Sequence, residues 1–324
     1  MEFRRFLKRG TLFLSPLIAW MVAIVAIDPF DYFNCSHLFS EKAKLETAGQ
    51  INSLTFNMLK EAHDPCENLI IGDSRAMSLP LDRIERLTGQ RYLKLAAFAL
   101  KLNESVDLFY FASSIKPVKS AVFTINFNEY NEYAYADRVH SVETMIRHPL
   151  AYIFDRNVAG AAWDVLKASV KRKDVIDSEP PMSQAAFWTN MVTMQAPEYY
   201  SRYGYPTALH EQLVKMVAFA KARGTQITFI VVPHHADFQC AVAMFGLNAQ
   251  YLQFKNDMSD LGVRVIDYDY VNDITTDRAD FRDPIHYNDR TGNLIADEVF
   301  RGPLKEGRLL DRSWAKNCSA YLFH

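Results

Sequence analysis

Residues 69–77 of the chain read LIIGDSRAM, in which a short apolar run is followed directly by Gly-Asp-Ser. Such a run is typical of a buried strand in a parallel sheet, and Gly72 lets the chain turn sharply where the strand ends. Ser74 then lies at the carboxyl end of the strand, where an open α/β sheet exposes its ligand crevice. The motif alone leaves two interpretations open, a catalytic serine or a turn with a helix N-cap.

Strand-like and helix-like segments alternate on either side of this motif. The expected strands are 68–72, 91–99, 120–127, 225–233 and 263–269, and the expected helices are 79–89, 104–115, 207–224, 247–262 and 290–302. Alternation with short links indicates parallel strands covered by helices. We therefore expect an α/β fold, a three-layer sandwich with a mainly parallel sheet.

The composition is that of a globular protein with a sizeable core, because 49% of the 324 residues are hydrophobic and 23% are charged. The formal net charge of -2 leaves no global basic field. Non-specific attraction to nucleic acid has no support, and we expect no nucleic-acid partner.

The N-terminus contains an uncharged segment, GTLFLSPLIAWMVAIVAI at residues 10–27, preceded by Arg4, Arg5, Lys8 and Arg9. As a helix it would be roughly 27 Å long, close to the thickness of a bilayer core. The basic flank predicts a single-pass transmembrane helix at 10–28 with a cytoplasmic N-terminus and a periplasmic or extracellular catalytic domain. A cleaved signal peptide and a buried core helix are the alternatives.

The remaining boundaries follow from shifts in pattern. We expect a cytoplasmic basic tail at 1–9, a tether at 29–65, the α/β domain at 66–305 and a C-terminal tail at 306–324. Within the domain, residues from about 130 to 205 break the alternation and are rich in aromatic side chains, which indicates an insertion or lid.

All four cysteines follow the uncharged segment, without a C-x-x-C motif, so no zinc site, other metal or cofactor is expected. Outside the cytoplasm an even number favours two disulfides. The sequence-local choice among three connectivities is Cys35 to Cys66 and Cys240 to Cys318. Four free buried thiols are the alternative.

A second motif, DPIHYND at residues 283–289, places Asp283 three residues before His286. This spacing lets the carboxylate orient the imidazole while the other ring nitrogen faces a nucleophile. Asp283-Pro284 is also compatible with a simple turn, and His286 with a surface histidine. The order of the motifs, with Ser74 after the first strand and Asp-x-x-His before the last helix, favours a Ser-His-Asp triad.

These residues resemble the SGNH (GDSL-like) hydrolases, whose flavodoxin-like fold carries a Gly-Asp-Ser block near its start and an Asp-x-x-His block near its end. The IDPFDYF segment at 27–33 makes the chain similar to the membrane-anchored branch that includes alginate O-acetylation proteins and the D-alanyl transfer protein of teichoic acids. The resemblance implies that Ser74 is the nucleophile, His286 the general base and Asp283 its orienting acid.

The resemblance also implies an oxyanion hole. It would combine the Ser74 N–H, a backbone N–H from Ala97 or Ala99 where the family has glycine, and the side chain of Asn126, with Asn128 as a second candidate. His235, in the segment VVPHHADF, is implied as a substrate contact, and Asn128 is a second candidate for substrate binding. Paired histidines at a strand end offer too few convergent ligands for a metal.

The expected function is acyl transfer at an ester, as an esterase or as an O-acetyltransferase acting on an envelope or extracellular polysaccharide. By analogy with the resembled systems, a membrane-bound protein would be the acyl donor. Two alternatives remain: an inactive glycan-binding or assembly protein with the same fold, and a hydrolase of lipid esters or thioesters.

Overall fold

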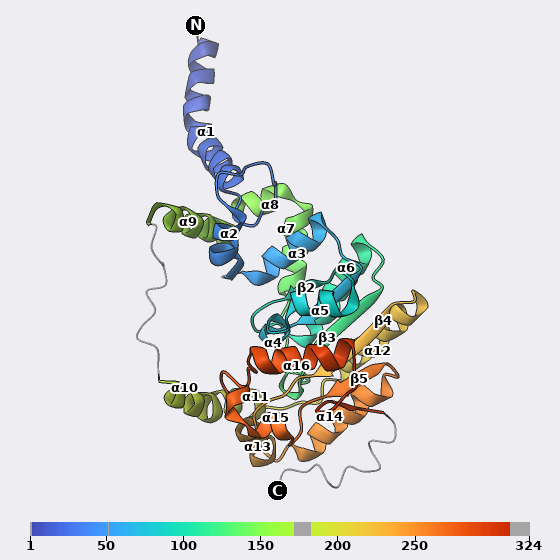
Figure 1. Ribbon diagram of the computed structural model, residues 1–324. Helices are drawn as coiled ribbons and strands as arrows, with labels where there is room; N and C mark the ends of the chain where they lie inside the picture. The colour runs from blue at the N-terminus through green and yellow to red at the C-terminus, as the bar shows by residue number, and fades with distance from the viewer. Residues whose placement is uncertain (1, 51, 172–182, 312–324) are drawn as a thin grey trace. The chain divides into compact units, whose positions relative to one another are not determined.

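The computed structural model describes residues 2–50, 52–171 and 183–311 and divides the chain into two compact units (Figure 1). Met1–His63 and His140–Glu179 form one of them, which we call the helical unit. Asp64–Val139 and Pro180–His324 form the other, which we call the sheet unit.

The sheet unit is built on six strands in the order β2-β1-β3-β4-β5-β6. They are β1 (Asn68–Gly72), β2 (Leu93–Ala96), β3 (Ser120–Ile125), β4 (Gln226–Val231), β5 (Arg264–Asp267) and β6 (Arg308–Leu309). The first five are parallel, and β6 pairs antiparallel with β5 at the edge. The expectation of an α/β fold with a mainly parallel sheet is confirmed, while β6 was not expected.

Helices cover both faces of this sheet, which gives it three layers. One face packs against α4 (Ser74–Met77), α5 (Leu81–Thr88) and α16 (Asp289–Phe300), in a cluster that includes Ile70 of β1 and Ile295 of α16. The opposite face packs against α6 (Leu102–Ile115) and α12 (Thr207–Ala222). There the Phe109 ring lies 6.0 Å from that of Phe123 and 6.1 Å from that of Phe219.

The other helices of the sheet unit are η2 (Phe127–Glu129), α10 (Gln184–Asn190), η3 (Met191–Gln195), α11 (Ala196–Tyr200), α13 (Ala236–Met244), α14 (Asn248–Asp260), α15 (Asp273–Thr276) and η4 (Arg278–Asp280). The helical unit contains α1 (Glu2–Ile27), α2 (Glu41–Lys44), η1 (Leu45–Gly49), α3 (Ser53–His63), α8 (Pro149–Phe154) and α9 (Arg156–Lys171). Helix α7 (Arg138–Arg147) lies almost wholly in it.

The predicted transmembrane helix at 10–28 is wrong, and so is the single-pass localisation derived from it. Among the residues that the structure describes, no helix combines the length and apolar character needed to cross a membrane. The last turns of α1 pack inside the helical unit: Ile24 is buried, and the Trp20 indole donates to the Ile153 carbonyl at 3.1 Å.

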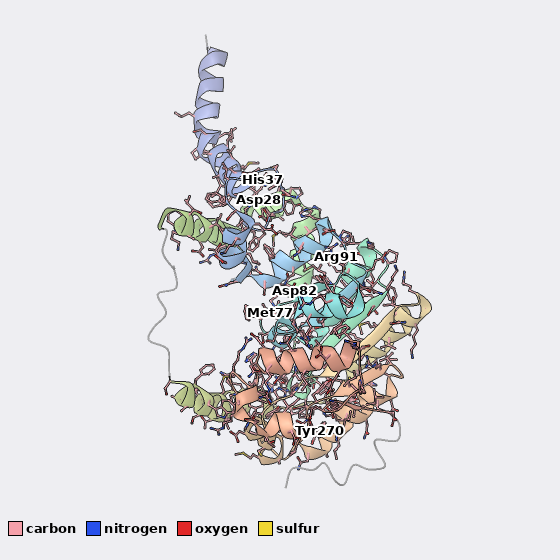
Figure 2. The ribbon with its side chains drawn as sticks, viewed as in Figure 1. Asp28, His37, Met77, Asp82, Arg91 and Tyr270 are labelled. Carbon is pink, nitrogen blue, oxygen red and sulfur yellow. The ribbon has the colours of Figure 1, made fainter. Side chains whose placement is uncertain are left out.

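Asp28 organises the chain where α1 ends (Figure 2). Its buried carboxylate accepts the backbone N–H groups of Tyr32, Phe33 and Asn34 at 2.9 Å and the Tyr152 hydroxyl at 3.0 Å. Burial and the negative charge of Asp28 raise the pKa of Tyr152, which keeps the phenol protonated as a donor. The DPFDYF segment is therefore a closed turn in the helical unit.

The expected Cys35–Cys66 disulfide is also wrong. Cys35 and Cys240 are exposed thiols, and the thiol of Cys66 donates to the Arg91 carbonyl at 3.4 Å. Cys318, the expected partner of Cys240, lies outside the described residues. No disulfide occurs within the described ranges. The prediction failed because an even number of cysteines says nothing about whether two of them lie close enough to be bonded.

Candidate active site

Ser74 lies at the point where the order of the sheet reverses. The chain leaves β1 for β2 on one side and later returns past it to β3 on the other, and ligands of open α/β sheets bind at such a switch point. Gly72 ends β1 where β3 passes very close, because a Cβ added to it would lie 1.9 Å from Thr124 Oγ1. The glycine is required by this contact, and α4 begins two residues later with Ser74.

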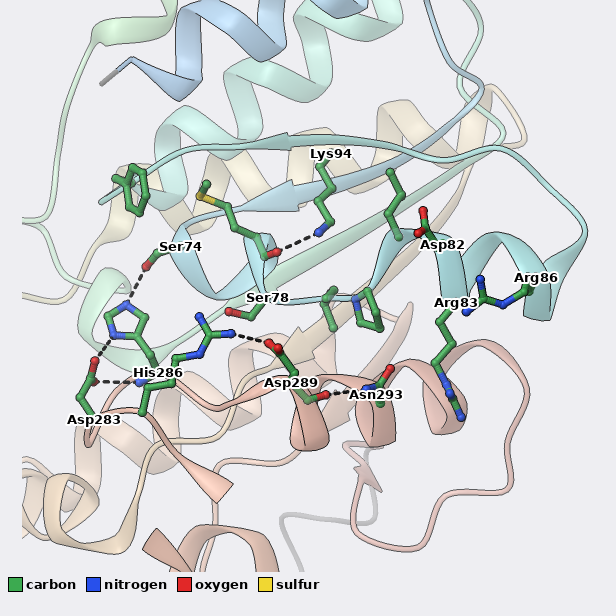
Figure 3. A pocket seen from close by; sticks show the side chains of 16 residues that line it. Ser74, Ser78, Asp82, Arg83, Arg86, Lys94, Asp283, His286, Asp289 and Asn293 are labelled. Carbon is green, nitrogen blue, oxygen red and sulfur yellow. Dashed lines mark hydrogen bonds and ion pairs between the residues drawn. The ribbon is translucent and has the colours of Figure 1, made fainter. Parts of the chain in front are cut away.

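Three side chains form a continuous hydrogen-bonded chain in the sheet unit (Figure 3). Ser74 Oγ lies 2.8 Å from His286 Nε2, and His286 Nδ1 lies 2.7 Å from Asp283 Oδ2. An ionised carboxylate only accepts hydrogen bonds, so Nδ1 donates to Asp283 and, in the neutral ring, Nε2 accepts from the Ser74 hydroxyl. This is the arrangement of a nucleophile, a general base and the acid that orients it.

Asp283 is held in the ionised state. Its Oδ1 accepts the backbone N–H groups of Ile285 at 2.8 Å and His286 at 3.0 Å. Burial raises the pKa of Asp283, but the hydrogen bond and charge of His286 and these two N–H groups outweigh it, so the net pKa is lowered. The Asp-x-x-His spacing thus lets the Asp283 carboxylate accept hydrogen bonds from both the backbone N–H and the ring Nδ1 of His286.

Tyr287 ties the His286 loop to the Ser74 turn. Its fully buried hydroxyl donates to the backbone carbonyl of Arg75 at 2.6 Å. The rigid Tyr287 side chain and the hydrogen bond of its hydroxyl therefore fix the separation between the backbones of Tyr287 and Arg75, which follow His286 and Ser74 in the sequence. Tyr287 was not predicted as a site residue, since a tyrosine next to a motif is not a distinctive signal in the sequence.

The serine and the histidine open onto a pocket of about 780 Å³. The His286 side chain is 31% exposed there, whereas that of Asp283 is 9% exposed. Volumes of this size are typical of small-molecule sites. The pocket is lined by Ser74, Met77, Ser78, Leu79, Pro80, Leu81, Asp82, Arg83, Arg86, Lys94, Phe98, Arg282, Asp283, His286, Asp289 and Asn293.

Of the two alanines in the loop after β2, Ala99 rather than Ala97 keeps its predicted role as an oxyanion donor, and neither is one of the residues that line the pocket. The Ala97 N–H donates to the Gly72 carbonyl at 3.2 Å, so it is already used. Ala99 has φ of +50°, in the left-handed region that usually selects glycine, and no described residue accepts its N–H. Arg138 donates to the carbonyls of Phe98 at 3.2 Å and Ala99 at 3.0 Å, which helps hold this strained loop.

Asn126 and Asn128 do not line the pocket. Both are buried, and the Asn126 side chain accepts the Glu129 N–H at 3.1 Å, which caps η2. Asn128 Oδ1 has no hydrogen-bond partner among the described residues. The structure therefore gives Asn126 a local capping contact and leaves its predicted oxyanion role without a pocket-facing position.

His235 is not one of the residues that line the pocket, although its backbone N–H donates to the carbonyl of Pro284, next to Asp283, at 2.9 Å. Its Nδ1 accepts the Asp237 N–H at 3.0 Å as the N-cap of α13. Its ring packs edge-on at 4.9 Å from that of Trp188 and 5.6 Å from that of Phe281. Burial lowers the pKa of His235 more than the charge of Asp237 raises it, which favours a neutral capping group.

Sequence reasoning missed a buried network of charged side chains next to Ser74. Arg75 is 2% exposed; its Nε donates to Asp73 at 2.9 Å, Nη1 to His234 Nε2 at 2.7 Å and Nη2 to Glu129 at 3.2 Å. Arginine has no acceptor, so His234 Nε2 accepts, and its Nδ1 donates to Asp269 at 3.2 Å. The only signal in the sequence was the pair of charges flanking Ser74.

The pKa values of the two carboxyl groups that contact Arg75 are shifted in opposite directions. Burial raises the pKa of Asp73, but Arg75 and a hydrogen bond from Glu129 lower it by more, so the net pKa is lowered and Asp73 is ionised. Burial and the charge of Asp73 raise the pKa of Glu129 well above its usual value, more than Arg75 lowers it. Glu129 is thus a neutral acid that donates to Asp73, and Asp73 and Arg75 form the charged pair.

A Glu129→Gln variant tests this protonation state through stability. Because the pKa of Glu129 is raised by folding, its contribution to stability is complete below the unfolded value and is lost as pH rises through the folded value. Glutamine keeps the donor and does not titrate. We expect the free energy of unfolding of the wild type, relative to the variant, to fall as pH rises above about 4.3, measured by urea unfolding at several pH values. A difference independent of pH would contradict it.

Known proteins resemble this chain in structure but not detectably in sequence. No family model matches the sequence, and no curated protein matches it. A solved structure described as a putative acylhydrolase from Bacteroides fragilis aligns with a TM-score of 0.37 and 10% identity, covering 74% of this chain and 89% of that one. One described as a putative platelet activating factor from Streptococcus pneumonia aligns at 0.38 and 11%, covering 79% and 92%.

Proposed function

We propose that this protein is a serine ester hydrolase that uses Ser74, His286 and Asp283. The observation that carries the proposal is the unbroken hydrogen-bonded chain from Asp283 through His286 to Ser74, at the switch point of the sheet and open to a pocket. A histidine that only stabilises the fold needs no buried acid on one ring nitrogen and no accessible hydroxyl on the other, whereas a general base needs both.

In the acylation step, Ser74 Oγ attacks the ester carbonyl carbon while its proton passes to His286 Nε2. The resulting imidazolium is stabilised by Asp283. The carbonyl oxygen becomes an oxyanion, for which we assign the backbone N–H groups of Ser74 and Ala99 as donors. The C–O bond then breaks, and the departing alkoxide takes the proton from His286 and leaves as an alcohol.

In the second step, a hydroxyl group attacks the acyl-serine and gives its proton to His286, which returns it to Ser74 as the acyl C–O bond breaks. Water as the attacking group completes an ester hydrolysis. A sugar hydroxyl in its place would make the protein an O-acyltransferase, which is the second candidate, and a pocket of about 780 Å³ has room for one acceptor sugar of a polysaccharide.

The full chain is expected to hydrolyse 4-nitrophenyl acetate and to lose that activity after reaction with one equivalent of a fluorophosphonate, which modifies activated serines. The measurement is nitrophenolate release against equivalents of inhibitor. Adding acetyl-acceptor sugars then separates the two candidates: acetylated sugar identifies a transferase, and acetate alone a hydrolase. An absence of both turnover and phosphonate reaction would contradict the proposal and favour an inactive binding protein.

A further inference from the structure

Lys94 occupies a position in the sheet where an apolar residue is expected. It lies on β2 between Tyr92 and Ala96, which point to the same side of the strand and belong to the apolar cluster under α4, α5 and α16. Lys94 is only half-buried at that position and lines the pocket that contains Ser74. A lysine on a core-facing side of a strand is unfavourable for folding, which points to a role in the site.

The ammonium group of Lys94 has one hydrogen bond and no carboxylate in direct contact, although the charge of Asp82 acts on it from a greater distance. Nζ donates to the Met77 carbonyl at 2.8 Å, the contact drawn in Figure 3. Among the described residues, no carboxylate lies within salt-bridge distance of it. Since an ammonium carries three donors, two remain for a ligand in the pocket.

The other charges of the pocket are largely paired. Arg83 donates to Asp297 at 2.6 Å, Arg282 is paired with Asp289, and Asp283 is paired with His286. The remaining charged lining residues are Lys94, Arg86 and Asp82. Two cations against one exposed carboxylate leave a positive balance, so a negatively charged ligand group is favoured beside Lys94.

We propose that Lys94 binds an anionic group, a carboxylate or a phosphate, of the ester substrate. This inference rests on the proposed function and deepens it, because it names the charge class of the substrate. An anionic oxygen would accept the two remaining ammonium donors as charge-assisted hydrogen bonds in partly desolvated surroundings. The Met77 carbonyl orients the ammonium, and the apolar lining residues such as Leu79 and Phe98 reduce competition from water.

The test uses three esters that differ only in the group at C6 of the sugar: an O-acetylated methyl glucoside, which is neutral, and the matching glucuronide and 6-phosphate, which are anionic. For the wild type we expect kcat/KM at least about tenfold higher for a charged ester than for the neutral one. The glucuronide and the phosphate arms tell a carboxylate site from a phosphate site. Lys94→Met should reduce the charged-to-neutral ratio to about one.

Lys119→Met is the matched control, because the Lys119 side chain is 71% exposed and paired with Glu67. Its ratio should equal that of the wild type. Competitive inhibition of 4-nitrophenyl acetate hydrolysis by inorganic phosphate and by glucuronate gives a second readout, which Lys94→Met should weaken. Removing a buried charge is compatible with folding, and Lys94→Gln provides a polar variant that also lacks the charge.

A preference for charged esters that survives in Lys94→Met, or its absence in the wild type, would overturn the inference. In either case the phosphonate still inactivates the enzyme, so the proposed function stands. If the phosphonate does not react and no ester is hydrolysed, the proposed function itself fails. The two failures are therefore distinguishable.

The preference should also depend on pH. Burial lowers the pKa of Lys94 to about 8, more than the charge of Asp82 raises it. The charged-to-neutral ratio should therefore fall as pH rises through about 8, and any effect of pH on the triad cancels in the ratio because all three esters use the same triad. The other charged residues that line the pocket are Asp82, Arg83, Arg86, Arg282, Asp283 and Asp289.

Discussion

Replacing Ser74 by alanine is expected to lower kcat for ester hydrolysis by roughly 10⁴- to 10⁶-fold with the fold intact. The hydroxyl is the atom that forms the acyl-enzyme, and Ser78 on the same pocket wall makes no contact with His286 that would let it substitute. Nitrophenolate release at saturating ester measures kcat, and thermal unfolding reports on the fold.

The control for this variant is Ser114→Ala. The Ser114 hydroxyl is exposed on α6 and donates only to the Phe111 carbonyl of its own helix, at 2.7 Å. It should therefore leave kcat unchanged. A His286→Ala variant should lose about as much activity as Ser74→Ala, and the double variant no more, because the two act as one unit. Additive losses, or near-normal activity in Ser74→Ala, would refute the triad.

Replacing Arg75 by methionine is expected to destabilise the sheet unit by about 3–5 kcal/mol. Methionine has a similar length but leaves the Asp73 carboxylate buried without its cation, and it removes donors to Glu129 and His234. Because Asp73 and Arg75 flank Ser74, the folded fraction of the variant should also have a lower kcat than the wild type. Urea unfolding of the full chain measures the change.

Arg83→Met is the matched control for Arg75→Met. Arg83 also pairs with an aspartate, Asp297, at 2.6 Å, but the two side chains are 40% and 42% exposed. Solvent screening limits such pairs to about 0–1 kcal/mol. Equal effects of the two variants on the free energy of unfolding would show that the buried network contributes no more than a surface ion pair.

The alternation of strands and helices, and the motifs at Ser74 and His286, could be predicted because each depends on local sequence. An apolar run ending in Gly72 indicates a strand and a turn, and the Asp-x-x-His spacing alone brings Asp283 to His286. The meeting of the two motifs followed from their order in a parallel α/β fold, whose strands end at one edge.

The features that sequence could not reveal depend on tertiary surroundings. The uncharged stretch of α1 was interpreted as membrane-spanning from its composition alone, which does not show the contacts of its last turns, such as the hydrogen bond from Trp20 to the Ile153 carbonyl. The network around Arg75 joins side chains from separate segments of the chain, including His234 and Asp269, so no local spacing indicates it. Ala99 takes a conformation that glycine usually occupies, which residue type alone would not suggest.

The most direct test of the central claim is to trap the acyl-enzyme. The full chain is mixed with 4-nitrophenyl acetate, quenched in acid within the first turnover, digested, and the acetylated peptide is located by mass spectrometry. The account predicts that the acetyl group lies on Ser74, at up to one equivalent per chain, and that Ser74→Ala retains none. Acetylation confined to another residue, with turnover preserved in Ser74→Ala, would contradict it.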